Sequence, residues 1–552
     1  MVRGAHGRPP RGYSHPMRVE FIGQAGVKIH TAHGSILCDP WFNPAYYASW
    51  FPYPRNDGLD HTALGDTDYL YISHLHRDHF DPAWLAAYCR KDATVILPAY
   101  PLPELEEALR SLGFATFIRT ASGVPVQHGG LTLVVESLTA PTDGPIGDSA
   151  LLVDDGEERL LNLNDSRPTD PDRLLVQGPI DICLLQFSGA IWYPMVYELP
   201  AKAREALARK KRAAQLTRAA RYVELIAPRV VIPSAGPPCF LDDELFRWND
   251  IHDAEDSIFP DQRFMVQRLT DEGHQAVLML PGSIGAFDAA GMFRVEHLSG
   301  VSSVQDVFAD KEAYLRRYAT DWSRRLAAEK ASWSGPRCDP LPDLKAWFEP
   351  LMALGPRVCD GIGAAVRIET EDASVLLDFP DRAVVADDGR DVDFKFTIPR
   401  TLLDHLVRTR TDDWVNSLFL SMRFSAWRRG AYNDYLYTWF KCLSVARIQY
   451  AEGFYAEHGP TEGTFDLSGW QVQHRSPHMK ADLTRFGTSD GSTLTCSIHG
   501  WQWDLATGRC LTADGHPLFA RPQSDAARDA ARDAARLPPP GPDPLAGGPE
   551  GA

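Results

Sequence analysis

Four metal-binding side chains stand within six positions of this chain and constrain its fold more than any other feature. His74, His76, Asp78 and His79 follow a strand-like segment at residues 67–72. Because side chains alternate along an extended chain, His74 and His76 can reach one ion. Asp78 and His79 in the following turn can reach the same ion or a second one. The pattern predicts a catalytic metal site at the C-terminal end of a strand.

Two later aspartates are the next candidates for this metal site. Asp148 shortly precedes the strand-like run 150–155, and Asp165 ends the run 159–165. Imidazole and carboxylate ligands together suit iron or zinc. We therefore predict that Asp148 and Asp165 supply further ligands, to one ion or to two.

A second metal-ligand pattern stands near the end of the chain. Ser476 and His478 are followed, after 17 intervening residues, by Cys496 and His499. This is the spacing of a Rieske [2Fe-2S] cluster, in which two thiolates bind one iron and two imidazoles bind the other. Such a cluster moves single electrons, so the first site is expected to use them. The pairing favours an oxygenase with non-haem iron, with zinc as the alternative metal.

Ser476 stands where a Rieske site has its first cysteine, and three interpretations remain open. The serine alkoxide can bind iron itself, as a harder and more basic ligand than thiolate. Alternatively, the chain has lost the cluster and the activity with it. In the third interpretation a loop shift lets Cys510 replace the missing thiolate.

Composition narrows the class of protein. A length of 552 residues predicts about three domains, and a net charge of −17 argues against nucleic acid as a partner. The sequence shows no signal-type apolar segment and no apolar run long enough for a membrane span, which predicts a cytoplasmic protein. The nine cysteines form no disulfide pattern, and only Cys496 has a ligand-like context.

The order of strand-like and helix-like segments predicts five regions. We expect a disordered N-terminus at 1–16, a layered α/β catalytic domain at 17–300, and an α+β connecting module at 301–455. A small all-β Rieske-type domain at 456–520 and a disordered tail at 521–552 follow. Asp81 and Pro82 are predicted to begin a helix, and the aromatic-rich segment 414–441 is predicted to be helical.

The metal-ligand segments resemble the metallo-β-lactamase superfamily, which implies an αββα sandwich for the first domain. Asp148 stands where that superfamily usually has its third-motif histidine. The last superfamily histidine is absent from the segment 230–236, VVIPSAG. The resemblance therefore implies a site that lacks a nitrogen ligand, which favours a mononuclear or oxygen-rich iron centre over a pair of zinc ions.

More closely, the chain resembles the sugar N-acetyl hydroxylases that join this fold to a Rieske domain. The segments that carry the likeness include SILCDPWFNPAYYASWFPYP (35–54), YISHLHRDHFD (71–81), QFSGAIWYPMVYELPAKA (186–203), PSAGPPCFL (233–241) and LTCSIHGWQW (494–503). The CMP-N-acetylneuraminate hydroxylases have the Rieske domain first. Here it comes last, as in the bacterial UDP-N-acetylmuramate hydroxylases.

This resemblance implies a monooxygenase that turns UDP-N-acetylmuramate, a peptidoglycan precursor, into UDP-N-glycolylmuramate. O2 would supply the oxygen, and an external ferredoxin or flavoprotein reductase would supply electrons through the Rieske cluster. The alternative is a metal-dependent hydrolase of the metallo-β-lactamase superfamily with a degenerate Rieske domain. Iron with oxygen-dependent turnover would favour the first function, and zinc with anaerobic turnover the second.

Overall fold

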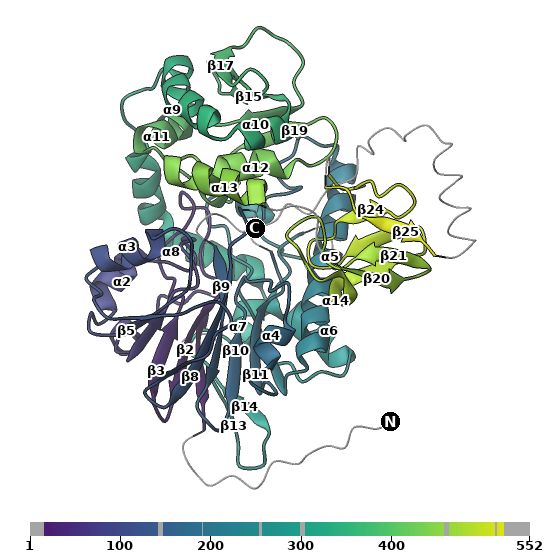
Figure 1. The fold of residues 1–552 in the computed structure, drawn as a ribbon. Coiled ribbons are helices and arrows are strands. Elements are labelled where there is room, and N and C mark those ends of the chain that lie inside the picture. Colours follow the sequence, from purple (N-terminus) through teal and green to yellow (C-terminus); the bar gives the residue numbers. More distant parts are fainter. Residues whose placement is uncertain are drawn as a thin grey trace.

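The computed structural model describes residues 16–141, 147–189, 191–252, 257–297, 304–457, 463–513 and 516–523. The segments 1–16 and 521–552, which the sequence predicts to be disordered, lie almost entirely outside the described residues. Three parts of the chain are arranged around the long helix α5 (Ala201–Ile226). In Figure 1 a two-sheet domain lies at the bottom, the connecting module lies above it, and the C-terminal domain lies to one side, next to α5.

The first domain contains two facing mixed sheets. In spatial order the first sheet contains β14 (Phe293–Glu296), β13 (Ile284–Phe287), β1 (Arg18–Gly23), β2 (Gly26–Thr31), β3 (Gly34–Cys38), β4 (Tyr69–Tyr71), β5 (Thr94–Leu97) and β6 (Phe117–Arg119). The second contains β12 (Val230–Ser234), β11 (Ile182–Gln186), β10 (Arg159–Asn162), β9 (Asp148–Asp154), β8 (Leu131–Leu138) and β7 (Val126–His128). Strands β3 to β6 run parallel, as do β10 to β12.

Alternate side chains of these strands pack on opposite faces of each sheet. In β9, Leu151 and Val153 join the core between the two sheets, whereas Ala150 and Leu152 face the helical layer with α5. Strands buried on both faces require nearly continuous apolar runs, and the sequences of β9 to β12 have them. The outer helices are α1 (His61–Gly65), α2 (Pro82–Tyr88) and α3 (Glu104–Ser111) on the first sheet, with α4 (Asp172–Leu175), α5 and α6 (Gln262–Asp271) on the second. The predicted αββα sandwich is confirmed.

The connecting module is an α+β unit. Its five-stranded sheet contains β17 (Ala383–Ala386), β16 (Ser374–Asp378), β15 (Ala365–Glu369), β18 (Phe394–Thr397) and β19 (Ser425–Arg428). Its helices are α9 (Pro340–Leu354), α10 (Pro356–Ile362), α11 (Arg400–Thr409), α12 (Asp434–Lys441) and α13 (Val445–Glu457). Before it come the 3₁₀ turn η2 (Phe246–Trp248), α7 (Val304–Phe308) and α8 (Lys311–Ser332), and α8 packs on the first domain through Tyr318 and Trp322 against Phe51.

The prediction of helix across residues 414–441 is wrong for most of that segment. It contains a π-helical turn, η3 (Val415–Phe419), then β19, and only then α12. Gly430 has a φ of +95°, and Asn433 caps α12 by accepting from the Leu436 amide. Pairing of β19 with β18 overrides the helical preference of the aromatic run.

The C-terminal domain is small and almost entirely β. One sheet contains β20 (Thr464–Leu467), β21 (Trp470–Gln473) and β25 (Ala520–Pro522). The other contains β22 (Gly487–Ser489), β23 (Thr493–Cys496) and β24 (Gln502–Asp504), preceded by the short helix α14 (Leu483–Phe486).

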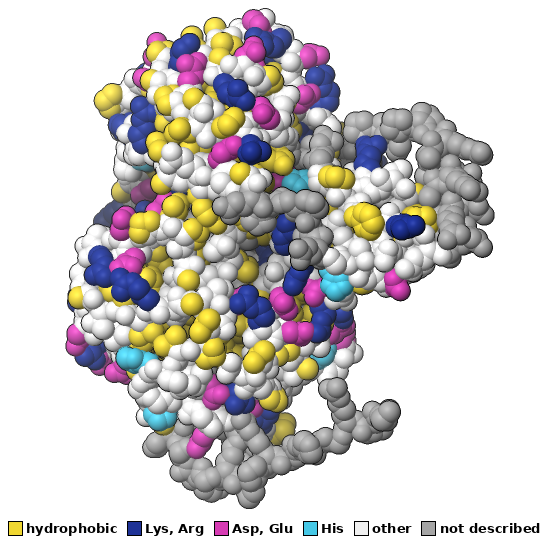
Figure 2. Space-filling model, in the orientation of Figure 1, with side chains coloured by type: hydrophobic (Ala, Val, Ile, Leu, Met, Phe, Trp, Pro, Cys, Tyr) yellow, Lys and Arg dark blue, Asp and Glu magenta, His cyan; other side chains and the backbone are white. Residues whose placement is uncertain are grey.

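Basic and acidic side chains are interspersed on the face of the molecule in Figure 2. Among the described residues, that face therefore shows no patch of a single sign despite the net charge of −17. None of the described helices combines the length and apolarity that crossing a bilayer requires.

Candidate metal centre and iron–sulfur site

The histidine cluster lies on the loop between β4 and α2. Asp39, directly after β3, accepts hydrogen bonds from the backbone amide and the hydroxyl of Ser73, both at 2.7 Å. Beyond the cluster, Asp81 accepts a hydrogen bond from the Trp84 amide at 3.0 Å, and Pro82 begins α2 as predicted. Carboxylates therefore anchor both ends of the loop.

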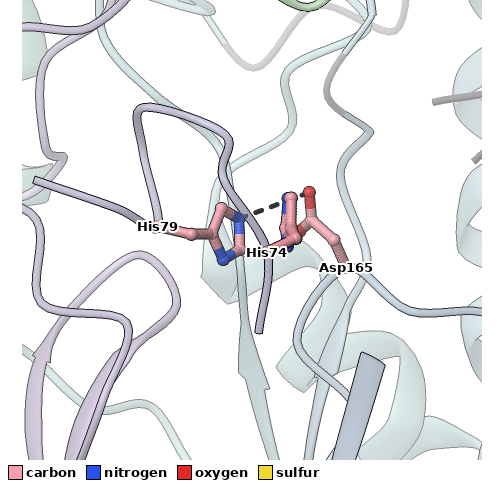
Figure 3. A group of neighbouring side chains, drawn as sticks. All are labelled: His74, His79 and Asp165. Carbon is pink, nitrogen blue, oxygen red and sulfur yellow. Dashed lines mark ion pairs between the residues drawn. The ribbon is translucent and has the colours of Figure 1, made fainter. Parts of the chain in front are cut away.

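Three predicted ligands lie together in the structure. The ligand atoms of His74, His79 and Asp165 all lie within 4.8 Å of one another, and all three residues are buried. The His79 Nε2 atom is 3.4 Å from Asp165 Oδ2, and Figure 3 shows the His79 ring turned toward this carboxylate. His79 comes from the β4–α2 loop and Asp165 from the loop after β10, so the two sheets meet at this site.

The other three predicted ligands lie next to this group. Among the described residues, they do not meet the condition that all ligand atoms lie within 4.8 Å of one another. The rings of His74 and His76 lie 4.2 Å apart, and neither nitrogen of the buried His76 has a hydrogen-bond partner. Asp148 Oδ1 lies 3.3 Å from His74 Nδ1. Asp78 Oδ2 lies 3.7 Å from His79 Nε2.

Residues that the sequence did not single out hold two of these ligands. Asp39 Oδ2 lies 3.0 Å from His79 Nδ1, which leaves Nε2 to face the site. The Asp78 carboxylate accepts hydrogen bonds from the Tyr46 hydroxyl at 2.5 Å and from the Gln24 amide at 2.8 Å. Asp39 was detectable in principle, because it directly follows β3, which runs parallel to β4. Tyr46 and Gln24 carry no such signal.

The charges at the site are strongly coupled. Burial opposes the charge of His79, but Asp78 and Asp165 outweigh it and raise the pKa of His79. Burial likewise opposes ionisation of Asp165, yet His79 lowers the pKa of that carboxyl. For His76, burial and then the His74 ring lower the pKa, which favours the neutral, ligating form of imidazole.

The residues present fit a bound metal ion. The Nε2 atoms of His74, His76 and His79 are buried and have no hydrogen-bond partner, which is costly unless an ion takes their lone pairs. Two histidines with one carboxylate, and further oxygen donors nearby, match the ligand set of non-haem iron sites.

A cavity of about 480 Å³ borders the metal loop. Its lining includes Tyr46, Arg77, Phe80 and His405. Tyr46 also holds Asp78, so the cavity shares a wall with the metal site. This volume lies within the usual range of small-molecule sites.

The Rieske-type ligands lie in the C-terminal domain on two facing loops. The rings of His478 and His499 lie 4.9 Å apart at an angle of 79°, and both Nδ1 atoms are buried without a partner. Burial raises the pKa of the Cys496 thiol to about 11, although the backbone amides of Ile498 and His499 favour the thiolate. Two free imidazole nitrogens and one buried thiol fit three of the four ligands of a Rieske cluster.

Ser476 occupies the fourth ligand position. Its hydroxyl donates to the His478 carbonyl oxygen and accepts from the Ala481 amide at 3.1 Å. Cys510 lies opposite Trp503, and its thiol accepts a hydrogen bond from the Ala513 amide. Iron binding by Ser476 requires its hydroxyl to lose the proton that it donates to the His478 carbonyl oxygen.

Two family models match parts of the chain. The Rieske [2Fe-2S] domain matches residues 471–520, which confirms the predicted Rieske-type domain. A model described as "Rv3818-like, SCP2-like domain" matches residues 341–457, in the connecting module.

Two solved structures show a loose likeness to the chain. CmlA, a diiron β-hydroxylase from Streptomyces venezuelae, aligns with 52% of this chain and 55% of its own at 18% identity and a TM-score of 0.33. Igni18, a metallo hydrolase from Ignicoccus hospitalis, aligns with 51% of this chain and 99% of its own at 15% identity and a TM-score of 0.33. Likeness at this level has no bearing on chemistry.

Curated relatives match almost from end to end. The chain is 48% identical over 513 residues to the Rieske 2Fe-2S iron-sulfur protein Rv3818 of Mycobacterium tuberculosis, covering 91% of this chain and 99% of the relative. A counterpart from Mycolicibacterium smegmatis is 48% identical over 518 residues, with the same coverage. With this identity over nearly the whole relative, the chain belongs to the Rv3818-like family of Rieske 2Fe-2S iron–sulfur proteins.

Proposed function

We propose that this chain is a monooxygenase that converts the N-acetyl group of UDP-N-acetylmuramate to N-glycolyl. The observation that carries the proposal is the buried group of His74, His79 and Asp165 in a chain that also contains a Rieske domain. Two histidines and one carboxylate suit non-haem iron oxygenases, and a hydrolase has no use for single electrons.

The three residues are proposed to hold iron, with His76, Asp78 and Asp148 as further donors. Iron held there would activate O2, which is the oxidant, toward an unactivated C–H bond that acid–base groups cannot attack. Asp39 orients His79 through its Nδ1 atom. Burial, followed by the Asp78 charge, raises the pKa of Tyr46, so its phenol keeps its proton and donates a hydrogen bond to Asp78.

The substrate is proposed to occupy the cavity beside the metal loop. Arg77 lines this cavity and offers a guanidinium to a phosphate or carboxylate of the sugar nucleotide. O2 is the proposed oxygen source, and an external ferredoxin or flavoprotein reductase is the proposed electron donor.

The test uses the full chain with iron, a reductase and ¹⁸O2. We expect UDP-N-acetylmuramate to gain one labelled oxygen atom, as measured by mass spectrometry. Asp165→Asn should lose iron and product together. Asp92→Asn is the control, because Asp92 lies in the same domain, is exposed and pairs with Arg90 away from both metal-binding sites. Turnover without O2, or with zinc in place of iron, would contradict the proposal and support the hydrolase alternative.

The cluster is tested separately from turnover. If Ser476 weakens cluster binding, Ser476→Cys should raise the iron and sulfide content of the purified chain, together with its visible absorbance. An unchanged content would mean that Ser476 already serves as the ligand or that another residue replaces it.

A further inference from the structure

The C-terminal domain packs against α5 and the segment after Asp165. Arg218 Nη1 donates to the Ile498 carbonyl at 3.1 Å, and Arg221 Nη2 donates to the Arg485 carbonyl at 2.8 Å. The Asp482 amide contacts the Thr169 carbonyl at 3.4 Å. Thr169 is four residues beyond Asp165, which corresponds to at most about 14 Å of extended chain. The two metal-binding sites are therefore linked within one chain by short connections.

Arg218 is an unusual residue at this junction. Its side chain is buried, with 7% of the residue exposed, and its Nη2 atom has no hydrogen-bond partner. Among the residues that the structure describes, no carboxylate forms an ion pair with it. A buried cation without a carboxylate partner is costly, which indicates a function beyond stability.

A second guanidinium reinforces this charge. Burial and then Arg167 lower the pKa of Arg218, but arginine retains its proton in proteins. Arg167 itself donates to the Gln186 side chain at 3.1 Å, and its Nε atom has no partner. The two positive charges of Arg167 and Arg218 therefore influence each other and also act on Asp165 and His499.

The iron–sulfur site lies close to the Arg218 and Arg167 side chains. Ile498, which accepts the Arg218 hydrogen bond, directly precedes the predicted cluster ligand His499. After burial, Arg167 and Arg218 are the next causes that lower the pKa of His499. A cluster that gains one electron becomes more negative by one charge, and adjacent positive charge stabilises that state.

We propose that Arg218 is a positioning residue that seats the His499 loop beside the metal centre and raises the reduction potential of the cluster. One electron enters the cluster from a donor such as dithionite or ferredoxin, no bond is broken, and Arg218 keeps its proton throughout. The inference deepens the proposed function, because it gives the electron a route within one chain.

The experiment measures the midpoint potential of the cluster by dye-mediated titration, with EPR detection and without substrate. Arg218→Gln should lower the reduced-to-oxidised ratio at a fixed potential about tenfold, which is about 59 mV for a one-electron couple. Arg218→Lys, which keeps the positive charge, should show only a small part of this shift. Arg221→Gln is the matched control, because Arg221 donates to the same domain from the same helix but is 38% exposed.

Equal potentials for Arg218→Gln and Arg221→Gln would overturn the proposal, as would equal shifts for Arg218→Gln and Arg218→Lys. The titration is repeated with Ser476→Cys so that cluster occupancy does not limit it. Failure to assemble a cluster in either form would also overturn the proposal. Because no turnover is involved, a potential shift without hydroxylation would contradict only the proposed function.

Discussion

At the scale of single residues, Asp39 shows how a carboxylate outside the metal group shapes the site. It contacts both Ser73 and His79, and its backbone φ of 43° lies in the left-handed region. That conformation is unfavourable for a residue other than glycine and persists where surrounding contacts determine it. Here it places the carboxylate against the His79 Nδ1 atom.

We expect Asp39→Asn to weaken metal binding about 10- to 100-fold, because an amide no longer fixes the His79 ring as a carboxylate does. The measurement is competition with a chelator, followed by elemental analysis. Asp68→Asn is the control, since Asp68 precedes the neighbouring strand β4 and accepts a hydrogen bond from the amide of the half-buried Ser35 at 2.8 Å, away from the metal site. Equal affinities in the two variants would show that Asp39 does not orient the ligand.

At the scale of elements, a strained turn of the first domain lies between the metal site and the connecting module. Tyr46, Tyr47 and Ala48 all have φ values between 49° and 56°, a conformation that costs free energy in each residue. The buried Arg423 stabilises this turn from the module. Its guanidinium donates to the Tyr47 and Ala48 carbonyls at 3.0 and 3.2 Å and pairs with Asp242 at 2.7 Å.

Arg423→Gln should therefore lower the free energy of unfolding by about 1.5–3 kcal/mol, because the charged hydrogen bonds to the turn are lost while Lys330, 3.1 Å from Asp242, still compensates that carboxylate. The measurement is urea denaturation. The exposed Arg429, which pairs with Asp393 at 3.1 Å, is the control, and Arg429→Gln should cost no more than about 1 kcal/mol. A small effect of Arg423→Gln would mean that the turn is stable without this contact.

At the scale of the whole molecule, one ion pair joins the C-terminal domain to the connecting module. His516 Nε2 lies 2.9 Å from Asp434 Oδ1 at the start of α12. Burial opposes the His516 charge, but Asp434 outweighs it and raises the pKa of His516. The groups that face His516 also include Lys480, His478, Tyr435 and Trp501.

This raised pKa fixes the sign of the pH dependence. The stabilisation is complete below the unfolded histidine pKa of about 6.5 and is lost as pH rises through the folded value. The Tm should therefore fall as pH rises from about 6.5 through the higher folded pKa of His516, and His516→Gln should reduce this fall. His474→Gln, in the same domain, is the control. An unchanged pH profile in His516→Gln would contradict this role for the ion pair.

Much of the architecture was predictable from local sequence. The apolar runs of β9 to β12 and the Asp81–Pro82 helix start are local patterns, and the structure contains both. The helix prediction for the segment 414–441 was wrong because pairing of β19 with the distant strand β18 overrides the local helical preference. The assignment of individual ligands to ions remains a prediction.

The sequence by itself determined which chemical groups are available: imidazoles and carboxylates at strand ends, and a thiol with two imidazoles at Rieske spacing. Only the tertiary structure decided that Asp39 lies behind His79, that Asp165 faces it, and that Arg218 lies under the His499 loop. The physical reason is one of range. Side-chain alternation acts over a few residues, whereas the order of strands in a sheet and the packing of one domain on another depend on contacts between distant parts of the chain.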